Sequence, residues 1–522
     1  MPITRISVQN FKGIGQKTEI TLKPITLLFG ANSAGKSTLL QALLYLREVL
    51  KRGDADIDVI EGGGEAIDLG GFRQLVHQHS LNNTLLVGIT IALDDDGIPM
   101  SQYSEEQNAG TRILHQGIDA IKEVGVEVHV EWSDDINKVV ITKYRVSADG
   151  SPILRIEQQR LDRPKLWLNE MHPAIRSVLV GEDECLPYDF EDSNLPPHMI
   201  LDQVTVIPAW HQPLRGTILG EDGDPEPPDI PKIEGVVERL ALGTGRLVID
   251  VLDQIRYIGP LREYPQRKSI AQRTPSTDRW ATGLAAWDWL GSQTSDFDHE
   301  KKVAEIGDWM SNTQHLDLGY TIQHKAWKEL AIGSDLFEEL LIAQYGDEME
   351  ASERLRRSII PQLLNLPTMF HFLMSDLRNG AEVDPQDVGN GVTQLIPVLV
   401  GLKADGGNIL AVEQPELHLH PAIQCRLADV FVRSIQDGRE RLLLLETHSE
   451  HLMLRLLRRV RETAAGTNDD EKLQLKPEDL SVLYISNQDG GMKVIHLPVN
   501  DDGDFDKPWP KGFFEERAEE LF

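Results

Sequence analysis

The chain has 522 residues, with 83 acidic and 52 basic side chains, so its formal net charge is −31. This charge argues against nonspecific binding of nucleic acid by the whole surface, although a local basic groove stays open. No apolar run approaches the roughly 20 residues of a membrane span, and the N-terminus lacks the apolar stretch of a secretory signal. The only two cysteines, Cys185 and Cys425, are too few for a disulfide framework. We therefore expect a cytoplasmic protein without membrane contact.

The strongest motif lies near the N-terminus. Residues 25–29 (ITLLF) predict a short buried strand, and residues 30–37 (GANSAGKS) fit the pattern G-x-x-x-x-G-K-[ST]. Leucines at helical spacing follow over residues 39–50. A strand, a glycine-rich loop and a helix form the phosphate-binding P-loop, in which backbone N–H groups and the helix N-terminus attract anions. We expect this loop to bind ATP through Asn32, Ser33, Ala34, Gly35, Lys36, Ser37 and Thr38.

Acidic residues that suit a magnesium ion come late in the chain. The apolar strand predicted at residues 409–412 ends at Glu413, and another at 442–445 leads into Glu446-Thr447-His448-Ser449. In P-loop ATPases the P-loop lysine reaches the β- and γ-phosphates, the following hydroxyl binds Mg²⁺, and an acid at a strand end holds the ion. Lys36 is thus expected at the phosphates, and the predicted metal ligands are Ser37 and Glu413.

A second glycine-containing loop precedes an apolar helix. Residues 388–394 (VGNGVTQ) lead into the helix predicted at 395–402. A helix N-terminus after such a loop is a second candidate phosphate-binding end.

The order of these motifs resembles the ABC-type ATPase heads of the RecF, SMC and OLD families. Residues 6–13 (ISVQNFKG) are similar to their first strand, residues 413–421 (EQPELHLHP) to their Walker B and D-loop, and residues 447–449 (THS) to their switch-histidine loop. The segments 257–262 (YIGPLR) and 509–514 (WPKGFF) resemble a bacterial subgroup of AAA-family or OLD-like ATPases without a Toprim domain, as found in antiphage defence systems. The resemblance covers roughly residues 1–75, 255–330 and 385–520.

This resemblance implies an α/β fold: an ABC-type P-loop NTPase head, split into N- and C-terminal lobes, with an inserted antiparallel β and helical region. We expect the N-lobe at 1–75, a β-rich and acidic insertion at 76–255, a helical or mixed insertion at 256–384, and the C-lobe at 385–522. Strands of the inserted sheet are predicted from apolar or alternating patterns at 84–93, 125–132, 138–146 and 151–158. Residues 349–377 predict a helical pair broken at Pro361 and Pro367.

The resemblance also implies a homodimer, or a higher oligomer, with ATP held between two heads. In such heads the signature loop of one copy closes the ATP bound to the Walker A loop of the other. Here Gly391, Thr393 and Gln394 would face the γ-phosphate in trans, although this loop lacks the Leu-Ser-Gly-Gly run of the family.

One departure from the family concerns catalysis. These heads usually carry a catalytic Glu directly after the Walker B acid Glu413, whereas this chain has Gln414. A glutamine can orient water but cannot take its proton, and general-base catalysis contributes about 10²–10⁴-fold. Two interpretations stay open: Glu416 serves as the base, or turnover is slow and the protein is an ATP-held switch. His448 is expected to sense the γ-phosphate in both.

These observations predict an ATP-binding, slowly hydrolysing ATPase whose ATP-dependent dimerisation controls a separately encoded effector. The resemblance suggests that this effector is an HNH or Toprim nuclease in antiphage defence. We expect it to be a separate protein because only about 70 residues follow the histidine loop, which is too few for a Toprim domain. The alternatives are a nucleotide-gated scaffold with negligible turnover and a RecF-like DNA-repair ATPase; contact with nucleic acid stays open.

Ion pairs are predicted for Arg455, Arg458, Arg459 and Arg461, and core or partner packing for Trp280, Trp287 and Trp289. Arg262 is considered as a charge-stabilising finger and Gln74 as a Mg²⁺ contact.

Overall fold

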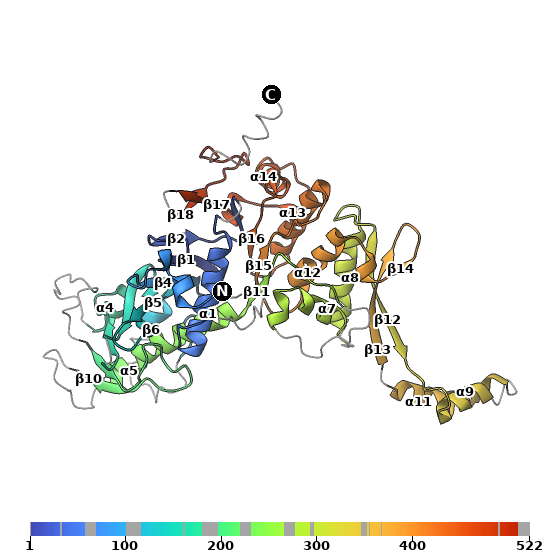
Figure 1. Ribbon diagram of the computed structural model, residues 1–522, viewed down its shortest axis with the longest axis horizontal. Helices are drawn as coiled ribbons and strands as arrows, with labels where there is room; N and C mark the ends of the chain where they lie inside the picture. The colour runs from blue at the N-terminus through green and yellow to red at the C-terminus, as the bar shows by residue number, and fades with distance from the viewer. Residues whose placement is uncertain are drawn as a thin grey trace.

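The protein is an elongated α/β molecule built around two large sheets (Figure 1). The computed structural model describes residues 2–31, 34–57, 69–100, 116–159, 162–179, 190, 197–219, 231–265, 277–292, 297–345, 352–353, 355–366, 368–488 and 491–509. A β-rich lobe lies at one end, the second sheet lies in the middle, and a ribbon with helices at its tip projects from the other end (Figure 1). The predicted α/β class is confirmed.

The central sheet has six strands in the order β11-β15-β16-β3-β17-β18. Its first five strands are parallel and β18 runs antiparallel to β17. Every residue of β3, β11, β15 and β16 is buried, as expected for parallel strands covered on both faces. The strand bounds are β3 (Ile25–Gly30), β11 (Ile255–Ile258), β15 (Ile409–Glu413), β16 (Leu442–Glu446), β17 (Leu480–Gln488) and β18 (Gly491–Leu497).

The second sheet has nine antiparallel strands in the order β10-β9-β8-β7-β6-β5-β4-β1-β2. It contains all four strands predicted for the insertion. Its strands β1 and β2 precede the P-loop in the chain, whereas β4 follows residue 75. The domain boundary expected at residue 75 therefore separates strands that pair within this one sheet. The bounds are β1 (Ile3–Gln9), β2 (Thr18–Thr21), β4 (Leu85–Ala92), β5 (Glu123–Ser133), β6 (Lys138–Ala148), β7 (Ser151–Glu157), β8 (Lys165–Leu168), β9 (Met199–Leu201) and β10 (Gly216–Ile218).

Two apolar cores lie on opposite faces of the central sheet, because successive side chains of each strand point to opposite faces. One core joins the central sheet to the nine-stranded sheet through α1 (Ser37–Arg52) and α6 (Thr244–Asp253). The other contains α7 (Leu284–Leu290), α8 (Phe297–Ser311), α12 (Asn390–Lys403), α13 (Pro421–Ile435) and α14 (Glu450–Ala464). Helix α1, which follows the P-loop, is therefore fixed between the two sheets.

Shorter helices connect these layers. They are α2 (Phe72–Leu75), α4 (Pro173–Leu179), α5 (Pro231–Glu238), a π-helical turn at Arg239–Gly243, and the 3-10 turns His77–His79, Thr277–Trp280, Pro385–Asp387, Glu471–Leu473 and Pro477–Asp479.

The third sheet corrects one prediction. Residues 349–377 were expected to form two helices, but β13 (Thr368–Asp376) is a strand paired along its whole length with β12 (Tyr320–Lys328). A short apolar run can form either a strand or a buried helix, and the distant partner β12 decided here. Among the described residues of this stretch, helix is found only before the strand. It includes the π-helical segment η5 (Leu355–Ile359) and α11 (Ile360–Asn365), which ends before Pro367. Strand β14 (Glu382–Val383) and helix α9 (Asp335–Tyr345) complete this region.

Most of the arginine and tryptophan residues for which the sequence predicts ion pairs or core packing have structural roles. Arg459 forms a bidentate pair with Asp429, and Arg458 pairs with Glu462 on its own helix. Trp287 is buried in the core beside Phe372, and Trp280 lies under the guanidinium of Arg256 at 4.2 Å. The predicted ion pairs and core packing are confirmed for these residues. In the described part of the chain, no helix is both long and apolar enough to cross a bilayer.

The nine-stranded sheet makes stability depend on pH through His129 on β5. Burial, together with Lys143 and Arg145, lowers the pKa of His129 to about 4. The imidazole is thus neutral in the folded protein, whereas in the unfolded chain it takes up a proton below pH 6.5. We expect the free energy of unfolding to fall as pH drops from 6.5 towards 4, by up to about 3 kcal/mol from this residue.

Urea titrations at several pH values measure this effect, with His129→Gln as the test variant. The pH dependence between 6.5 and 4 should be shallower in the variant than in the wild type. The exposed His79→Gln serves as the control and should leave the slope unchanged. Identical slopes for His129→Gln and the wild type would refute the prediction.

Candidate nucleotide-binding site

The candidate site lies where β3, β15 and β16 of the central sheet end. Parallel strands direct their carboxyl ends to one edge, where ligands of α/β sheets usually bind. Glu413 at the end of β15 and Glu446 at the end of β16 are register partners. The P-loop leaves β3 at the same edge and leads into α1 at Ser37.

The P-loop is held close to the neighbouring strands. A side chain on Gly30 would collide with the carbonyl oxygen of Ile485. Gly35 has φ of +94°, which favours glycine, and a Cβ there would lie 2.7 Å from the Met492 sulfur. Ala34 and Thr38 are buried, whereas Asn32 and Ser33 lie outside the described residues. Close packing against the backbone therefore requires glycine at position 30, and the left-handed backbone favours glycine at position 35.

Lys36 and Ser37 meet an acid that the sequence analysis did not select. The Ser37 hydroxyl donates a hydrogen bond to Glu446 Oε2 at 2.7 Å, and Lys36 Nζ lies 3.8 Å from Glu446 Oε1. Lys36 Nζ also donates to the carbonyl oxygens of Gly30 and Ala31, at 3.2 and 3.0 Å. Glu446 had the same signal that selected Glu413, an acid at the end of an apolar strand, so it could have been found.

Three buried glutamates surround Lys36. Burial, together with the nearby charge of Glu413, raises the pKa of Glu446 to about 7. Burial also raises the pKa values of Glu413 and Glu416, against hydrogen bonds that favour their charged forms. Burial lowers the pKa of Lys36, while all three glutamates oppose this shift. The edge therefore concentrates more negative charge than Lys36 alone can balance.

The segment after β11 supports the Walker B strand. The Tyr257 hydroxyl donates to Glu413 Oε1 at 2.7 Å. The buried Arg262 donates to the carbonyl oxygens of Gln394 at 3.0 Å and Glu413 at 2.7 Å. Arg262 thus ties the start of α12 to the end of β15. Its guanidinium is occupied by backbone carbonyls, so it is a positioning residue in this state and not an exposed finger.

The residues after Glu413 bend sharply. Gln414 has φ of +47°, and its N–H donates to the Glu446 carbonyl oxygen at 2.7 Å. Glu416 is 9 % exposed and its Oε1 accepts a hydrogen bond from the His448 N–H at 2.7 Å. Glu416 Oε2 and His448 Nε2 are buried without a hydrogen-bond partner among the described residues. Two polar atoms from the Walker B and histidine loops are therefore available to a ligand.

The signature-like loop differs in part from the expectation. The side chains of Thr393 and Gln394 are buried, and Gln394 Nε2 donates to the Arg262 carbonyl oxygen at 2.7 Å. These two side chains cannot face another copy in this state. Gly389 and Asn390 at the start of α12 are exposed, while Gly391 packs against the backbone of His418. The start of this helix, at Gly389 and Asn390, is the part of the loop that is open to a phosphate in trans.

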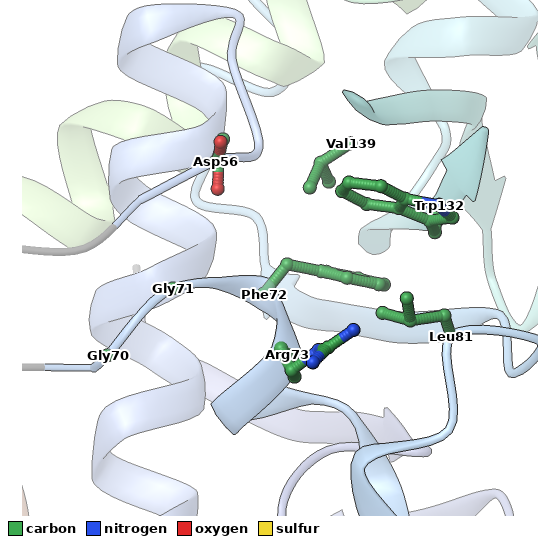
Figure 2. Close-up of a pocket in the computed structure, with 8 residues that line it drawn as sticks. All are labelled: Asp56, Gly70, Gly71, Phe72, Arg73, Leu81, Trp132 and Val139. Carbon is green, nitrogen blue, oxygen red and sulfur yellow. The ribbon is translucent and has the colours of Figure 1, made fainter. Parts of the chain in front are cut away.

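Two pockets flank the segment that carries Gln74. One has a volume of about 510 Å³ and is lined by Lys12, Leu69, Gly70, Gln74, Val76, Gln78 and His79. Since Lys12 Nζ donates to Gln41 on α1 at 2.5 Å, this pocket lies beside the first turns of that helix. The other pocket, about 300 Å³, is enclosed by Phe72, Leu81, Trp132 and Val139, with Asp56 and Arg73 beside them (Figure 2). Gln74 is exposed and lies with Lys12 rather than with the glutamates.

The residues present fit a nucleotide with Mg²⁺. The P-loop lysine and the helix start would receive phosphates. Ser37, Glu413 and Glu446 offer oxygen ligands, which Mg²⁺ prefers. The excess of buried carboxylates is the kind of site that a divalent cation stabilises, because an uncompensated buried charge is costly.

Three family models match parts of the chain. A family described as "AAA ATPase domain" matches residues 1–95, and one described as "AAA domain, putative AbiEii toxin, Type IV TA system" matches residues 320–454. Residues 475–522 match a family described as "Protein of unknown function (DUF3696)". No curated protein matches the chain.

Solved structures with some similarity are SMC heads. A head bound to the C-winged helix domain of ScpA is 12 % identical, with a TM-score of 0.40, and the match covers 96 % of this chain and 98 % of that one. The head domain from Thermotoga maritima is 9 % identical, with a TM-score of 0.32 and coverage of 96 % and 100 %. A head with an extended coiled coil, bound to a ScpA domain derived from Pyrococcus furiosus, is 12 % identical, with a TM-score of 0.36 and coverage of 99 % and 98 %.

The glutamate cluster predicts an unusual effect of Glu446→Gln. The folded pKa of about 7 exceeds the ordinary value of 4.5, so ionised Glu446 destabilises the ligand-free protein above pH 7. Removing its charge should raise the free energy of unfolding at pH 8 by about 1–3 kcal/mol.

Chemical denaturation of the ligand-free protein at pH 8 and pH 5 measures this effect. At pH 5 the folded wild type already holds Glu446 protonated, so the two proteins should differ little. The conservative variant Glu440→Gln, on the surface before β16, should change neither value. A variant that is less stable than the wild type at pH 8 would contradict the prediction.

Proposed function

We propose that this chain, an ABC-type P-loop ATPase head, binds ATP with Mg²⁺ and is closed around the nucleotide by a second copy of itself. The observation that carries the proposal is the meeting of Lys36, Ser37, Glu413 and Glu446 at one sheet edge. Lys36 would exchange its bonds to the loop carbonyls for bonds to the β- and γ-phosphates. When bound, Mg²⁺ would neutralise charge on these phosphates, held by Ser37 and by Glu413 or Glu446.

The nucleoside would occupy the pocket beside the start of α1. That pocket offers the ammonium of Lys12 and the polar side chains of Gln74 and Gln78. It adjoins the phosphate-binding helix start through the Lys12–Gln41 contact. Its volume of about 510 Å³ is sufficient for a drug-sized ligand.

Hydrolysis would use Glu416 as general base, with Gln414 orienting the attacking water. The water oxygen would bond to the γ-phosphorus, the bond from that phosphorus to the bridging oxygen would break, and the water proton would pass to Glu416. Burial raises the pKa of Glu416, which makes its carboxylate a stronger proton acceptor. Burial and Lys36 lower the pKa of His448, so its neutral ring would donate or accept a hydrogen bond at the γ-phosphate.

Dimer closure would bring the exposed residues Gly389 and Asn390 of one copy to the ATP of the other. Arg262 supports this proposal because it connects the start of α12 to Glu413, so a change at one phosphate end would reach the other. By resemblance, the ATP-bound dimer would control a separately encoded effector such as a nuclease in antiphage defence.

A nucleotide-gated scaffold with negligible turnover is the second candidate function, favoured by Gln414 at the position of the usual catalytic glutamate. A RecF-like role in DNA repair receives less support, since Arg455, Arg458 and Arg459 pair with acidic residues of the chain itself. A phosphate-release assay with and without DNA distinguishes these functions. Clear Mg²⁺-dependent turnover would reject the scaffold, and strong stimulation by DNA would favour DNA repair.

Lys36→Ala should weaken ATP binding at least 100-fold, because the loop loses its one side-chain cation for the phosphates. Equilibrium titration with a fluorescent ATP analogue measures the dissociation constant. Lys51→Ala removes an exposed lysine from the far end of the same helix and should bind as the wild type does. Tight binding by Lys36→Ala would disprove the assigned nucleotide site.

Gln414→Glu should raise the turnover number about tenfold or more, because it adds a proton acceptor at the usual catalytic position. Glu416→Gln should lower turnover at least 100-fold while ATP binding persists. Steady-state phosphate release gives both rates, and the nucleotide titration provides the binding control. A lower rate in Gln414→Glu would show that residue 414 is not at the base position, and unchanged turnover in Glu416→Gln would exclude Glu416 as the base.

A further inference from the structure

The C-terminal strands of the central sheet form a wall beside the P-loop. Strand β17 pairs in parallel with the whole of β3, so that Ile485 lies opposite Gly30, the first residue of the P-loop. Strand β18 pairs with the other side of β17, at the edge of the sheet (Figure 1). Its residue Met492 lies opposite Asn487, two positions beyond Ile485. The start of β18 is therefore near the sheet edge from which the P-loop leaves.

Met492 fills the space between the P-loop and a second turn. A Cβ placed on Gly35 of the P-loop would lie 2.7 Å from the Met492 sulfur, and one placed on Gly13 would lie 3.1 Å from the Met492 Cβ. The Met492 N–H also donates a hydrogen bond to the Gly13 carbonyl oxygen at 2.8 Å. The Met492 side chain is buried. One side chain thus sets the spacing between the P-loop and the turn at residues 10–14.

That turn carries one wall of the pocket proposed for the nucleoside. Lys12, next to Gly13, lines the pocket together with Gln74 and Gln78. The turn is fixed on its other side, because the Lys12 N–H donates to the Leu75 carbonyl oxygen at 2.5 Å. Lys12 has φ of +49°, a conformation that persists in a non-glycine residue only where the surroundings hold it. Met492 is therefore a common neighbour of the phosphate loop and of the nucleoside pocket.

An aromatic cluster supports the P-loop strand from the opposite face of the sheet. Trp509 packs edge-to-face against Phe29 and against Tyr484 of β17, with ring centroids 5.8 Å apart in both pairs. Phe505 lies 5.2 Å from Trp509. Such aromatic pairs stabilise packing beyond the area that they bury. Because Phe29 directly precedes Gly30, the cluster fixes the end of β3 at which the P-loop begins.

A phosphate-binding loop is effective when its N–H groups already converge on the anion, because a loop that must first be ordered binds more weakly. Met492 lies in the core on the α1 side of the central sheet, and Trp509 packs against the core on the other side. The P-loop strand and its loop are thus held from both faces by residues of the C-terminal segment.

We propose that Met492 is a positioning residue that keeps the P-loop and the nucleoside pocket in register, and that Trp509 supports the start of the P-loop from the opposite face. This inference rests on the proposed function, which supplies the nucleotide. Neither residue takes part in the reaction. Both act by fixing the shape of the loop before the nucleotide arrives.

Met492→Ala should raise the dissociation constant of ATP about tenfold or more, because the void lets the P-loop and the turn move apart. Turnover at saturating ATP should stay unchanged, since no group near the reacting atoms is removed. Met492→Leu preserves the volume and should bind ATP within about threefold of the wild type. Titration with a fluorescent ATP analogue and steady-state phosphate release measure the two quantities.

Leu497→Ala is the matched control, because Leu497 is a buried residue at the other end of β18. It also leaves a void in the core and should lower the melting temperature, but it should bind ATP as the wild type does. A purely structural role of Met492 predicts that both alanine variants lose stability and that neither loses affinity. Met492→Val, a milder truncation, should give an intermediate dissociation constant and extends the series if Met492→Ala does not fold.

Trp509 is tested in the same titration. Trp509→Ala should weaken ATP binding about tenfold, and Trp509→Phe should restore most of the affinity, because a ring then remains against Phe29. Wild-type affinity in Met492→Ala or Met492→Val, or an equal loss in Leu497→Ala, would overturn the role of Met492. Wild-type affinity in Trp509→Ala would overturn that of Trp509. A wild-type chain that does not bind ATP would instead contradict the proposed function itself.

Discussion

The site depends on the electrostatic balance between one buried ammonium group and three buried carboxylates. Lys36 lies 3.8 Å from Glu446, and Glu413 and Glu416 also act on its pKa. Burying these acids is unfavourable, and burial raises the pKa values of all three glutamates, although Lys36 and the buried Arg262 lie close enough to favour charged carboxylates. A ligand that brings a divalent cation would relieve the repulsion. The ligand-free arrangement would thus favour the metal–nucleotide complex that we propose.

The two sheets make this balance possible by holding the charged groups in place. Helix α1 is enclosed between the central sheet and the nine-stranded sheet, so Lys36 and Ser37 start from a rigid element. Tyr257 bonds to Glu413, and Arg262 fixes the backbone on either side of it. Through Arg262 the start of α12 is coupled to the same strand end. A displacement at the glutamates therefore has a direct physical route to the surface proposed for dimer closure.

The sequence by itself determined the local chemistry: the strand–loop–helix of the P-loop, the acid at the end of residues 409–413, and the four inserted strands, whose alternation depends on neighbours along the chain. Tertiary structure decided whatever depends on distant pairing. Glu446 became a partner of Ser37 because β16 lies beside β3. Residues 368–376 became a strand because they pair with β12, whose register partners lie 40 to 56 positions earlier in the chain. Likewise, Arg262 and Gln394 became internal supports only when β11 and α12 met. The hydrophobic periodicity of a segment indicates whether that segment prefers helix or strand. The partner of a buried charge or of a strand edge depends instead on how distant parts of the chain pack together.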